Sequence, residues 1–252
     1  MKDRGRWLKG VEHLWGALGF EPLPKHVLLM YGEPMVGKST LAAAIARWWA
    51  QRHNTNVTVI GTEASYYEED FAEALGRYLK DVKASVLTYT DRNVALRVLL
   101  GKRYMSQVHN MGAVIIDSIS AITDDVAVEV VMSTGSIEQR PISSRAAPVG
   151  RYIVKILKDV VVARNGLGIV IAHAGSTAGT GKYRGVVDYR PSLAIRCGHY
   201  VSYMLHLGFW ERNREYRKLT VVAARSRPWL EGRSALFRFA ENDVEVYVRE
   251  EQ

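Results

Sequence analysis

One nine-residue segment, Gly32 to Thr40, constrains the fold of this chain more than any other feature. It reads GEPMVGKST and fits the pattern G-x-x-x-x-G-K-[ST] at every fixed position. An apolar run over residues 27–31 precedes it, and a helical pattern over 41–49 follows it. In this order, a strand, a glycine-containing loop and a helix N-terminus can surround a phosphate with main-chain amides. The segment therefore predicts a phosphate-binding loop at the end of a buried strand.

The residue types inside the loop indicate what each would contribute. Lys38 is expected to reach the β- and γ-phosphates of a nucleotide, and Ser39 to hold Mg²⁺ through its hydroxyl. The backbone amides of residues 34–40 are expected to face the phosphate oxygens. The predicted site for ATP comprises Gly32, Glu33, Pro34, Met35, Val36, Gly37, Lys38, Ser39 and Thr40.

Composition limits the classes of protein to consider. The chain has 252 residues, a net charge of +8 and a single cysteine, Cys197, which excludes an internal disulfide. No apolar stretch approaches the roughly 20 residues that a membrane span needs, and no secretory leader is recognisable, so the cytoplasm is the expected location. The basic surplus favours a polyanion such as nucleic acid as a partner.

Short apolar runs alternate with helical patterns along the chain, which predicts an α/β fold with a mostly parallel central sheet and helices on both faces. A helix over 4–19, within a lead-in of residues 1–24, is expected to precede a core over 25–252. Strands are predicted at 26–31, 56–60, 84–89, 113–116 and 168–173, and further helices at 68–79, 91–109 and 150–163. Residues 118–148 are expected to be irregular. An antiparallel extension is predicted from four final strands at 199–207, 216–224, 234–240 and 244–248.

Polar residues follow three of the predicted strands, where side chains meet at the carboxyl edge of a parallel sheet. Asp117 is expected to bind Mg²⁺, Glu63 to deprotonate the attacking water, and His173 to sense the γ-phosphate. The alternatives are a capping aspartate, a solvated loop glutamate and a hydrogen-bonded histidine at a strand end. Tyr66 and Tyr67 are candidates for stacking on adenine.

Two long segments, 133–151 and 174–197, are rich in cations and small residues, and the second also contains tyrosines. Both are expected to be loops, and this mixture suits the backbone and bases of single-stranded DNA. The predicted DNA contacts are Arg140, Arg145, Arg151, Lys182, Tyr183, Arg184, Arg190 and Arg196. A solvated loop without a ligand is the alternative for each segment.

Arg225 and Arg227 close a predicted strand and, with one residue between them, point the same way from it. They are expected to reach the γ-phosphate of a nucleotide bound to a neighbouring subunit, as arginine fingers do. Surface charge beside a turn is the alternative.

These residues together resemble the RecA-like ATPase core, and in particular archaeal RadA paralogues and KaiC-type ATPases. The loop at 32–40 is similar to the family's phosphate loop, and the strands at 59–63 and 114–119 are similar to its catalytic and Mg²⁺-binding strands. The resemblance implies that Glu63 is the catalytic base. It also implies that His173 stands where recombinases place a γ-phosphate-sensing glutamine.

The same resemblance implies a function for the whole chain. It implies a Mg²⁺-dependent ATPase, stimulated by DNA, that assists homologous recombination and repair with single-stranded DNA favoured. Its protein partners would be a recombinase, another RecA-like subunit or further copies of itself. Because a short lead-in replaces the N-terminal domain of full recombinases, a core-only paralogue is expected. The alternatives are a non-hydrolysing mediator that docks on a recombinase and a KaiC-like signalling ATPase that binds no DNA.

Overall fold

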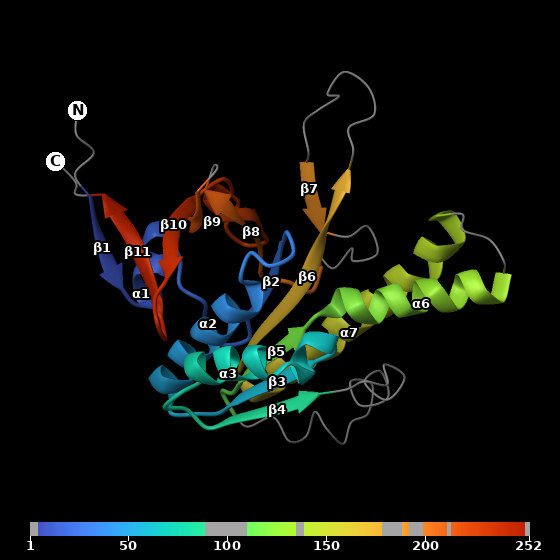
Figure 1. Ribbon diagram of the computed structural model, residues 1–252, viewed down its shortest axis with the longest axis horizontal. Helices are drawn as coiled ribbons and strands as arrows, with labels where there is room; N and C mark the ends of the chain where they lie inside the picture. Colours follow the sequence, from blue (N-terminus) through green and yellow to red (C-terminus); the bar gives the residue numbers. More distant parts are fainter. Residues whose placement is uncertain are drawn as a thin grey trace.

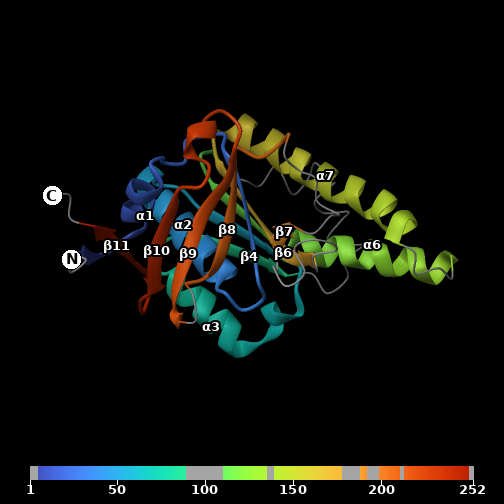
Figure 2. The same cartoon turned by 90° about the horizontal axis from the view of Figure 1, so that it is seen from above.

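A single mixed sheet runs through the molecule, and helices cover both of its faces (Figure 1, Figure 2). The computed structural model describes residues 5–88, 110–134, 139–177, 188–191, 199–210 and 213–249. Its strands are β1 (Gly5–Lys9), β2 (Val27–Gly32), β3 (Val57–Gly61), β4 (Ala84–Thr88), β5 (Ala113–Asp117), β6 (Leu167–Thr177), β7 (Asp188–Pro191), β8 (Tyr203–Trp210), β9 (Asn213–Ala224), β10 (Ser234–Phe239) and β11 (Val244–Arg249). Its helices are α1 (Val11–Leu18), α2 (Lys38–His53), α3 (Glu69–Tyr78), α6 (Ile119–Thr134) and α7 (Gln139–Arg164), with short 3-10 helices η1 (Ala64–Tyr67) and η2 (Pro228–Leu230).

The strands of the sheet follow the order β1-β11-β10-β9-β8-β2-β6-β5-β3-β4, and β7 pairs with the outer end of β6. From β8 to β4 each strand is parallel to its neighbour. From β8 to β1 each strand is antiparallel to its neighbour. The predicted parallel centre with a C-terminal antiparallel extension is therefore confirmed.

Alternate residues of β2 enter two different cores. Leu28 and Met30 belong to the core that also contains buried residues of α1, α2 and α3. Val27 and Leu29 belong to the core that contains buried residues of α6 and α7. Since helices cover both faces, every position of the strand is buried, and this explains why it is a continuous apolar run in the sequence.

The expected helix over residues 4–19 is wrong in its first part. Residues Gly5–Lys9 form β1, which pairs with β11 at the edge of the sheet, so the two ends of the described chain lie side by side (Figure 1). Trp7 stacks on Tyr216 with ring centroids 5.2 Å apart. The helix begins only at Val11, after Gly10 turns the chain with a φ of 129°. The strand conformation of residues 5–9 depends on pairing with β11 and on aromatic packing. Neither can be predicted from a local helical pattern.

Residues 118–148, expected to be irregular, are largely helical. α6 begins directly after β5, and α7 runs from Gln139 through Pro148. The two helices pack together and extend beyond the sheet (Figure 2). Ile122 of α6 and Ile153 of α7 are buried in the core that these helices form with the sheet. The proline suggested a loop, but α7 continues through it, although a proline within a helix removes one backbone hydrogen bond.

Smaller differences concern element boundaries. β8 begins at Tyr203 rather than at 199. Ser202 lies in the preceding connection, where its hydroxyl accepts a hydrogen bond from the backbone N–H of Val27. The predicted helix over 91–109 lies outside the described residues. No helix in the described part of the chain combines the length and apolarity needed to cross a membrane.

Candidate functional site

The predicted phosphate loop connects the end of β2 to the start of α2. Lys38 is the first residue of α2, and its ammonium group donates hydrogen bonds to the carbonyls of Gly32 (3.1 Å) and Glu33 (2.7 Å). Burial lowers the pKa of Lys38, while the negative charges of Asp117, Glu63 and Glu33 act in the opposite direction. The loop is thus folded around a fixed, buried cation.

Two glycines of the loop occupy positions where a side chain has no room. A Cβ atom on Gly32 would come within 2.0 Å of the Leu207 carbonyl oxygen, and one on Gly37 within 2.4 Å of the Phe239 ring. Gly37 also has a φ of 94°, in the left-handed region that favours glycine, and Met35 has a φ of 61°. Left-handed residues in a short loop are typical of backbone nests that bind anions. The geometry therefore fits the function predicted for this segment.

Asp117 ends β5 and is buried beside the loop. Tyr66 donates a hydrogen bond of 2.8 Å to its Oδ2 atom, and the Ser39 hydroxyl donates another. Burial, followed by the charge of Glu63, raises the pKa of Asp117 to about 6 despite these bonds and the nearby charge of Lys38. A buried carboxylate beside a serine hydroxyl is the oxygen donor set that Mg²⁺ prefers, so these residues fit the predicted metal.

Glu63 and His173 form a hydrogen-bonded pair, in which Oε1 of Glu63 lies 2.9 Å from Nε2 of His173. Ser118 also bonds the Glu63 side chain, and the backbone N–H of His173 donates to the Ser120 hydroxyl at 2.8 Å. Burial opposes ionisation of Glu63, but the bonds from His173 and Ser118 and the charge of Lys38 lower its pKa overall. The bond to Glu63 raises the pKa of His173. Each partner thereby stabilises the charged form of the other.

Strand order brings these groups together. β3, which delivers Glu63, is not next to β2, because β6 and β5 lie between them. Gly32 is opposite His173 in the pairing of β2 with β6, and Gly61 is opposite Asp117 in the pairing of β3 with β5. Because these parallel strands end at the same edge of the sheet, the loop, both carboxylates and the histidine meet there.

Arg225 and Arg227 lie at the other end of the sheet from this cluster. They follow β9, whose last residue, Ala224, is opposite Tyr203 at the start of β8. Tyr203 is in turn opposite Leu28, near the start of β2. Since the phosphate loop follows the far end of β2, the two arginines are remote from the loop of their own chain. They therefore lie too far away to contact a nucleotide bound to the phosphate loop of their own chain.

The predicted DNA contacts fall into two groups. Arg140 and Arg145 lie in α7, not in the loop expected for them, and Arg151 is exposed farther along the same helix. Arg190 belongs to β7, which forms a ribbon with the outer end of β6 that stands out from the sheet (Figure 1). The others lie outside the described residues: Lys182, Tyr183, Arg184 and Arg196.

Three side chains contact the site residues in ways that the sequence did not predict. Tyr66, a candidate for adenine stacking, is buried, and its hydroxyl bonds Asp117 instead. Ser118 and Ser120 bond Glu63 and the backbone of His173, respectively. The only sequence signal for the two serines is their position within three residues after Asp117.

The sequence matches no protein-family model and no curated protein. The known proteins that resemble this chain were therefore found by their fold. A KaiC-like protein, PH0186, from the hyperthermophilic archaeon Pyrococcus horikoshii OT3 matches 97% of this chain and 100% of its own, with a TM-score of 0.59 and 18% identity. The RadB recombinase matches 92% of this chain and 94% of its own, with a TM-score of 0.57 and 20% identity. The chain therefore has the fold of these two solved structures, a RecA-like fold.

Proposed function

We propose that this protein binds ATP with Mg²⁺, hydrolyses it and contacts DNA, with single strands favoured, in recombination or repair. The observation that supports the ATPase most strongly is the meeting of Lys38, Asp117 and Glu63 at one edge of the sheet, where their charges influence one another. Segments far apart in the sequence converge there. The fold shared with a KaiC-like protein and a recombinase supports the same function.

ATP binding is assigned to the loop and the start of α2. The amides of residues 34–40 and the helix N-terminus would replace water around the phosphates. Lys38 would exchange its bonds to the carbonyls of Gly32 and Glu33 for bonds to the β- and γ-phosphates. The cation is already buried, so its attraction to a phosphate is little screened by water.

Mg²⁺ binding is assigned to Ser39 and Asp117. When bound, the ion neutralises charge on the β- and γ-phosphate oxygens. Tyr66 holds one oxygen of the Asp117 carboxylate, which fixes the orientation of the other. Because burial makes ionised Asp117 unfavourable on its own, this residue gains from a cation beside it.

Proton transfer is assigned to Glu63, which would accept the proton of the attacking water. Its lowered pKa keeps it ionised at neutral pH, as a general base must be. His173 contacts Glu63 and lies on β6, which continues into the ribbon with β7. We assign to His173 the task of linking the γ-phosphate to that ribbon.

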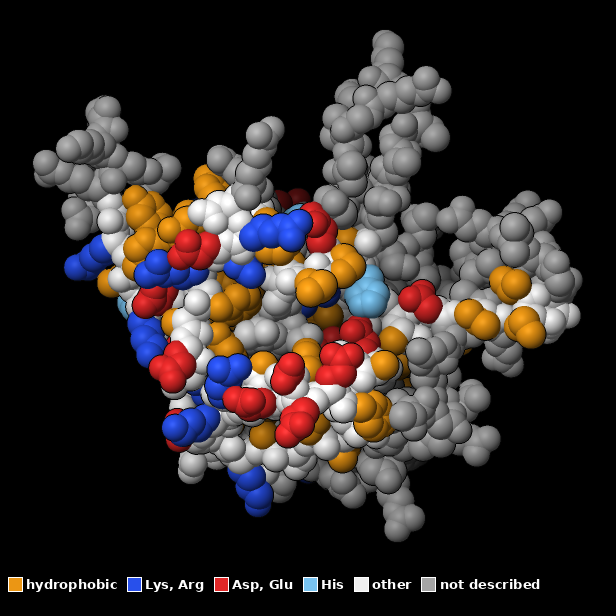
Figure 3. Space-filling model, viewed as in Figure 1, with side chains coloured by type: hydrophobic (Ala, Val, Ile, Leu, Met, Phe, Trp, Pro, Cys, Tyr) orange, Lys and Arg blue, Asp and Glu red, His pale blue; other side chains and the backbone are white. Residues whose placement is uncertain are grey.

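DNA contact is assigned to the β6–β7 ribbon and the exposed side of α7, where Arg190 and Arg151 lie. The face around α3 is unsuitable for DNA, because acidic side chains gather there (Figure 3) and would repel the phosphate backbone of a nucleic acid. These exposed side chains are Glu68, Glu69, Asp70 and Glu73.

The experiment that tests this function is ATP hydrolysis by the purified protein, titrated with single-stranded DNA. Wild-type protein should hydrolyse ATP in a Mg²⁺-dependent reaction that DNA stimulates. Glu63→Gln should keep ATP affinity and lower turnover by on the order of 10²-fold or more, because the base is lost. Glu68→Gln, an exposed change of the same kind nearby, should leave turnover unchanged. Equal turnover in wild type and Glu63→Gln would remove Glu63 from the mechanism.

A second candidate, supported by the likeness to the KaiC-like protein, is an ATPase with no DNA role. Salt-dependent DNA binding that is lost on neutralising Lys182, Arg184 and Arg190 would argue against it.

A third candidate, a recombination mediator that does not hydrolyse ATP, would bind ATP in the same assay but show no turnover with or without DNA.

A further inference from the structure

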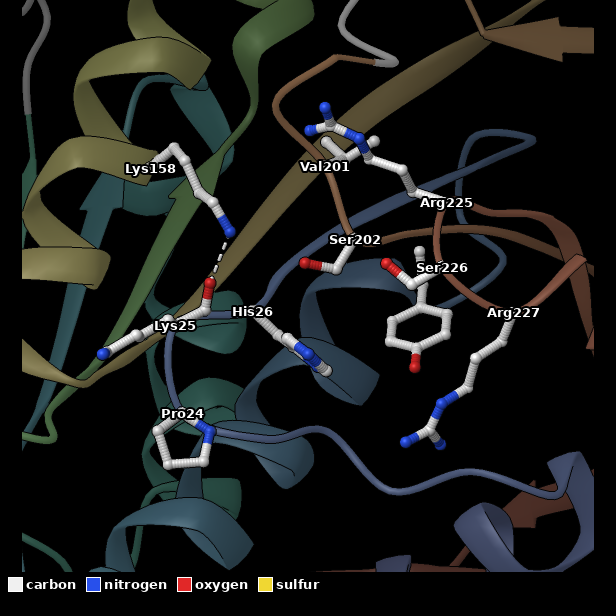
Figure 4. A pocket seen from close by; sticks show the side chains of 10 residues that line it. Pro24, Lys25, His26, Lys158, Val201, Ser202, Arg225, Ser226 and Arg227 are labelled. Atoms are coloured by element: carbon white, nitrogen blue, oxygen red, sulfur yellow. Dashed lines mark hydrogen bonds between the residues drawn. The ribbon is translucent and has the colours of Figure 1, made fainter.

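A basic cavity of about 570 Å³ lies at the end of the sheet opposite the phosphate loop. It is formed by the connection before β2, the connection before β8, helix α7 and the segment that follows β9 (Figure 4). Its volume is within the range of small-molecule sites in proteins. Its lining residues are Pro24, Lys25, His26, Lys158, Val201, Ser202, Tyr203, Arg225, Ser226 and Arg227.

Three cations from different elements line this cavity. Lys158 comes from α7, and Arg225 and Arg227 come from the segment after β9; the Arg225 side chain extends toward Val201 and that of Arg227 extends to the opposite side of the segment (Figure 4). The Lys158 ammonium donates to the Lys25 carbonyl at 2.5 Å, and Arg225 donates to the His199 carbonyl. Among the described residues, none of the three cations forms an ion pair with a carboxylate, and none of the lining residues is acidic.

The cations are close enough to disfavour one another. Burial, followed by the positive charge of Arg225, lowers the pKa of Lys158. Burial, then the charges of Lys158 and Arg227, lowers the pKa of His26 to about 4. Such a cluster is held together at an electrostatic cost that an anion would remove. An anionic ligand is therefore the partner that the cavity lacks.

Neutral donors complete the lining. Nδ1 of His26 accepts a hydrogen bond of 3.1 Å from the Leu23 backbone, so the neutral ring carries its proton on Nε2. The Ser202 hydroxyl oxygen accepts from the Val27 backbone at 3.2 Å, which leaves the hydroxyl proton for a ligand. Ser226 adds a second hydroxyl. Several N–H and O–H donors around clustered cations suit phosphate, which offers oxygen acceptors in several directions.

We propose that this cavity is a second phosphate-binding site, in which Lys158, Arg225 and Arg227 supply the charge and His26, Ser202 and Ser226 supply neutral donors. Two kinds of ligand carry the required chemistry: the phosphodiester backbone of a nucleic acid and the polyphosphate tail of a nucleotide. The site is independent of the phosphate loop, so its existence does not depend on the proposed ATPase. It also gives Arg225 and Arg227 a ligand within a single chain.

Inorganic tripolyphosphate, titrated by calorimetry at low ionic strength, tests the site. In Lys38→Ala, where the loop has lost its cation, tripolyphosphate should still bind. Adding Lys158→Ala should weaken this binding about tenfold or more, as expected for loss of a charge-assisted contact. Lys155→Ala is the matched control, because Lys155 lies one turn earlier on α7, is exposed and pairs with Asp159 instead of the cavity. If Lys38→Ala does not fold, wild-type protein should show two binding sites and Lys158→Ala one.

Competition identifies the source of the phosphate. Displacement of tripolyphosphate by an oligothymidylate would identify a nucleic-acid backbone as the ligand, and displacement by ATP a nucleotide. The proposal is overturned if Lys38→Ala binds no tripolyphosphate while wild type shows one site. It is also overturned if Lys155→Ala weakens binding as much as Lys158→Ala, which would indicate diffuse attraction, or if neither competitor displaces the probe.

Discussion

Asp117 places a carboxylate in the interior of the protein, bonded to the hydroxyls of Tyr66 and Ser39. Its pKa rises from 3.8 to about 6, so at pH 7 the folded, ligand-free protein holds a charge that the unfolded chain holds more easily. Asp117→Asn should therefore stabilise the ligand-free protein by on the order of 3 kcal/mol, since one pKa unit corresponds to about 1.4 kcal/mol.

The same substitution should remove the dependence of ATP affinity on Mg²⁺, because the amide carries no charge for the ion. Thermal unfolding without ligand and ATP titrations with and without Mg²⁺ measure the two effects. A less stable Asp117→Asn protein, or an unchanged response to Mg²⁺, would contradict the assignment of this residue.

His173 and Glu63 predict a pH dependence of stability. The pKa of His173 is raised above 6.5, so its contribution is complete below pH 6.5 and is lost as pH rises through the raised value. The pKa of Glu63 is lowered below 4.5, so its contribution is present above pH 4.5 and is lost as pH falls through the lowered value. The pair is therefore strongest in the window between these limits.

His173→Gln should accordingly be less stable than wild type near pH 6, and the difference in stability should disappear as the pH rises toward 9. Unfolding temperatures of the nucleotide-free proteins across this range provide the measurement. Glu63→Gln should flatten the same difference, since it removes the other partner. A constant offset between wild type and His173→Gln at every pH would show that the ion pair does not contribute.

At the scale of single elements, some glycines lie where a side chain has no room and others lie where a side chain would fit. Gly32 ends β2 against the backbone of β8, so Gly32→Ala should destabilise the protein by roughly 1–3 kcal/mol through a clash that no rotamer relieves. Gly76 lies within α3 with nothing near its missing Cβ atom, so Gly76→Ala should stabilise by about 1 kcal/mol. Denaturant unfolding of both variants tests the contrast, and destabilisation by Gly76→Ala would contradict it.

The elements also show which local patterns predict structure well. The buried strands β2, β3, β5 and β6 were predictable, because strands covered on both faces are continuous apolar runs. β1 and the start of α7 were not, because their conformation depends on partners distant in the sequence. β1 needs β11 beside it, and α7 needs α6 and the sheet beneath it.

At the scale of the whole molecule, strand order could not be inferred from the sequence. The motif residues of the site were predictable one by one, since each follows an apolar run or fits a known pattern. Their mutual contacts, such as Tyr66 with Asp117 and Glu63 with His173, depend on which strands are neighbours. Strand order also separates Arg225 from the phosphate loop of its own chain.

That separation predicts that subunits share sites if the arginines assist hydrolysis. Lys38→Ala and the double variant Arg225→Ala/Arg227→Ala should each hydrolyse ATP poorly alone. A mixture should recover turnover, because the first protein can supply arginines to the nucleotide held by the second. Steady-state turnover of mixed and separate proteins at equal total concentration gives the result. A mixture no more active than its components would exclude shared sites.

The central claim is that the loop between β2 and α2 grips the phosphates of ATP, and calorimetry of ATP binding tests it most directly. At millimolar ATP and Mg²⁺, the folded wild-type protein should bind nucleotide at one tight site, and Lys38→Ala should bind it at least about tenfold more weakly. The absence of any association with folded wild-type protein, or equal affinity in Lys38→Ala, would contradict the claim.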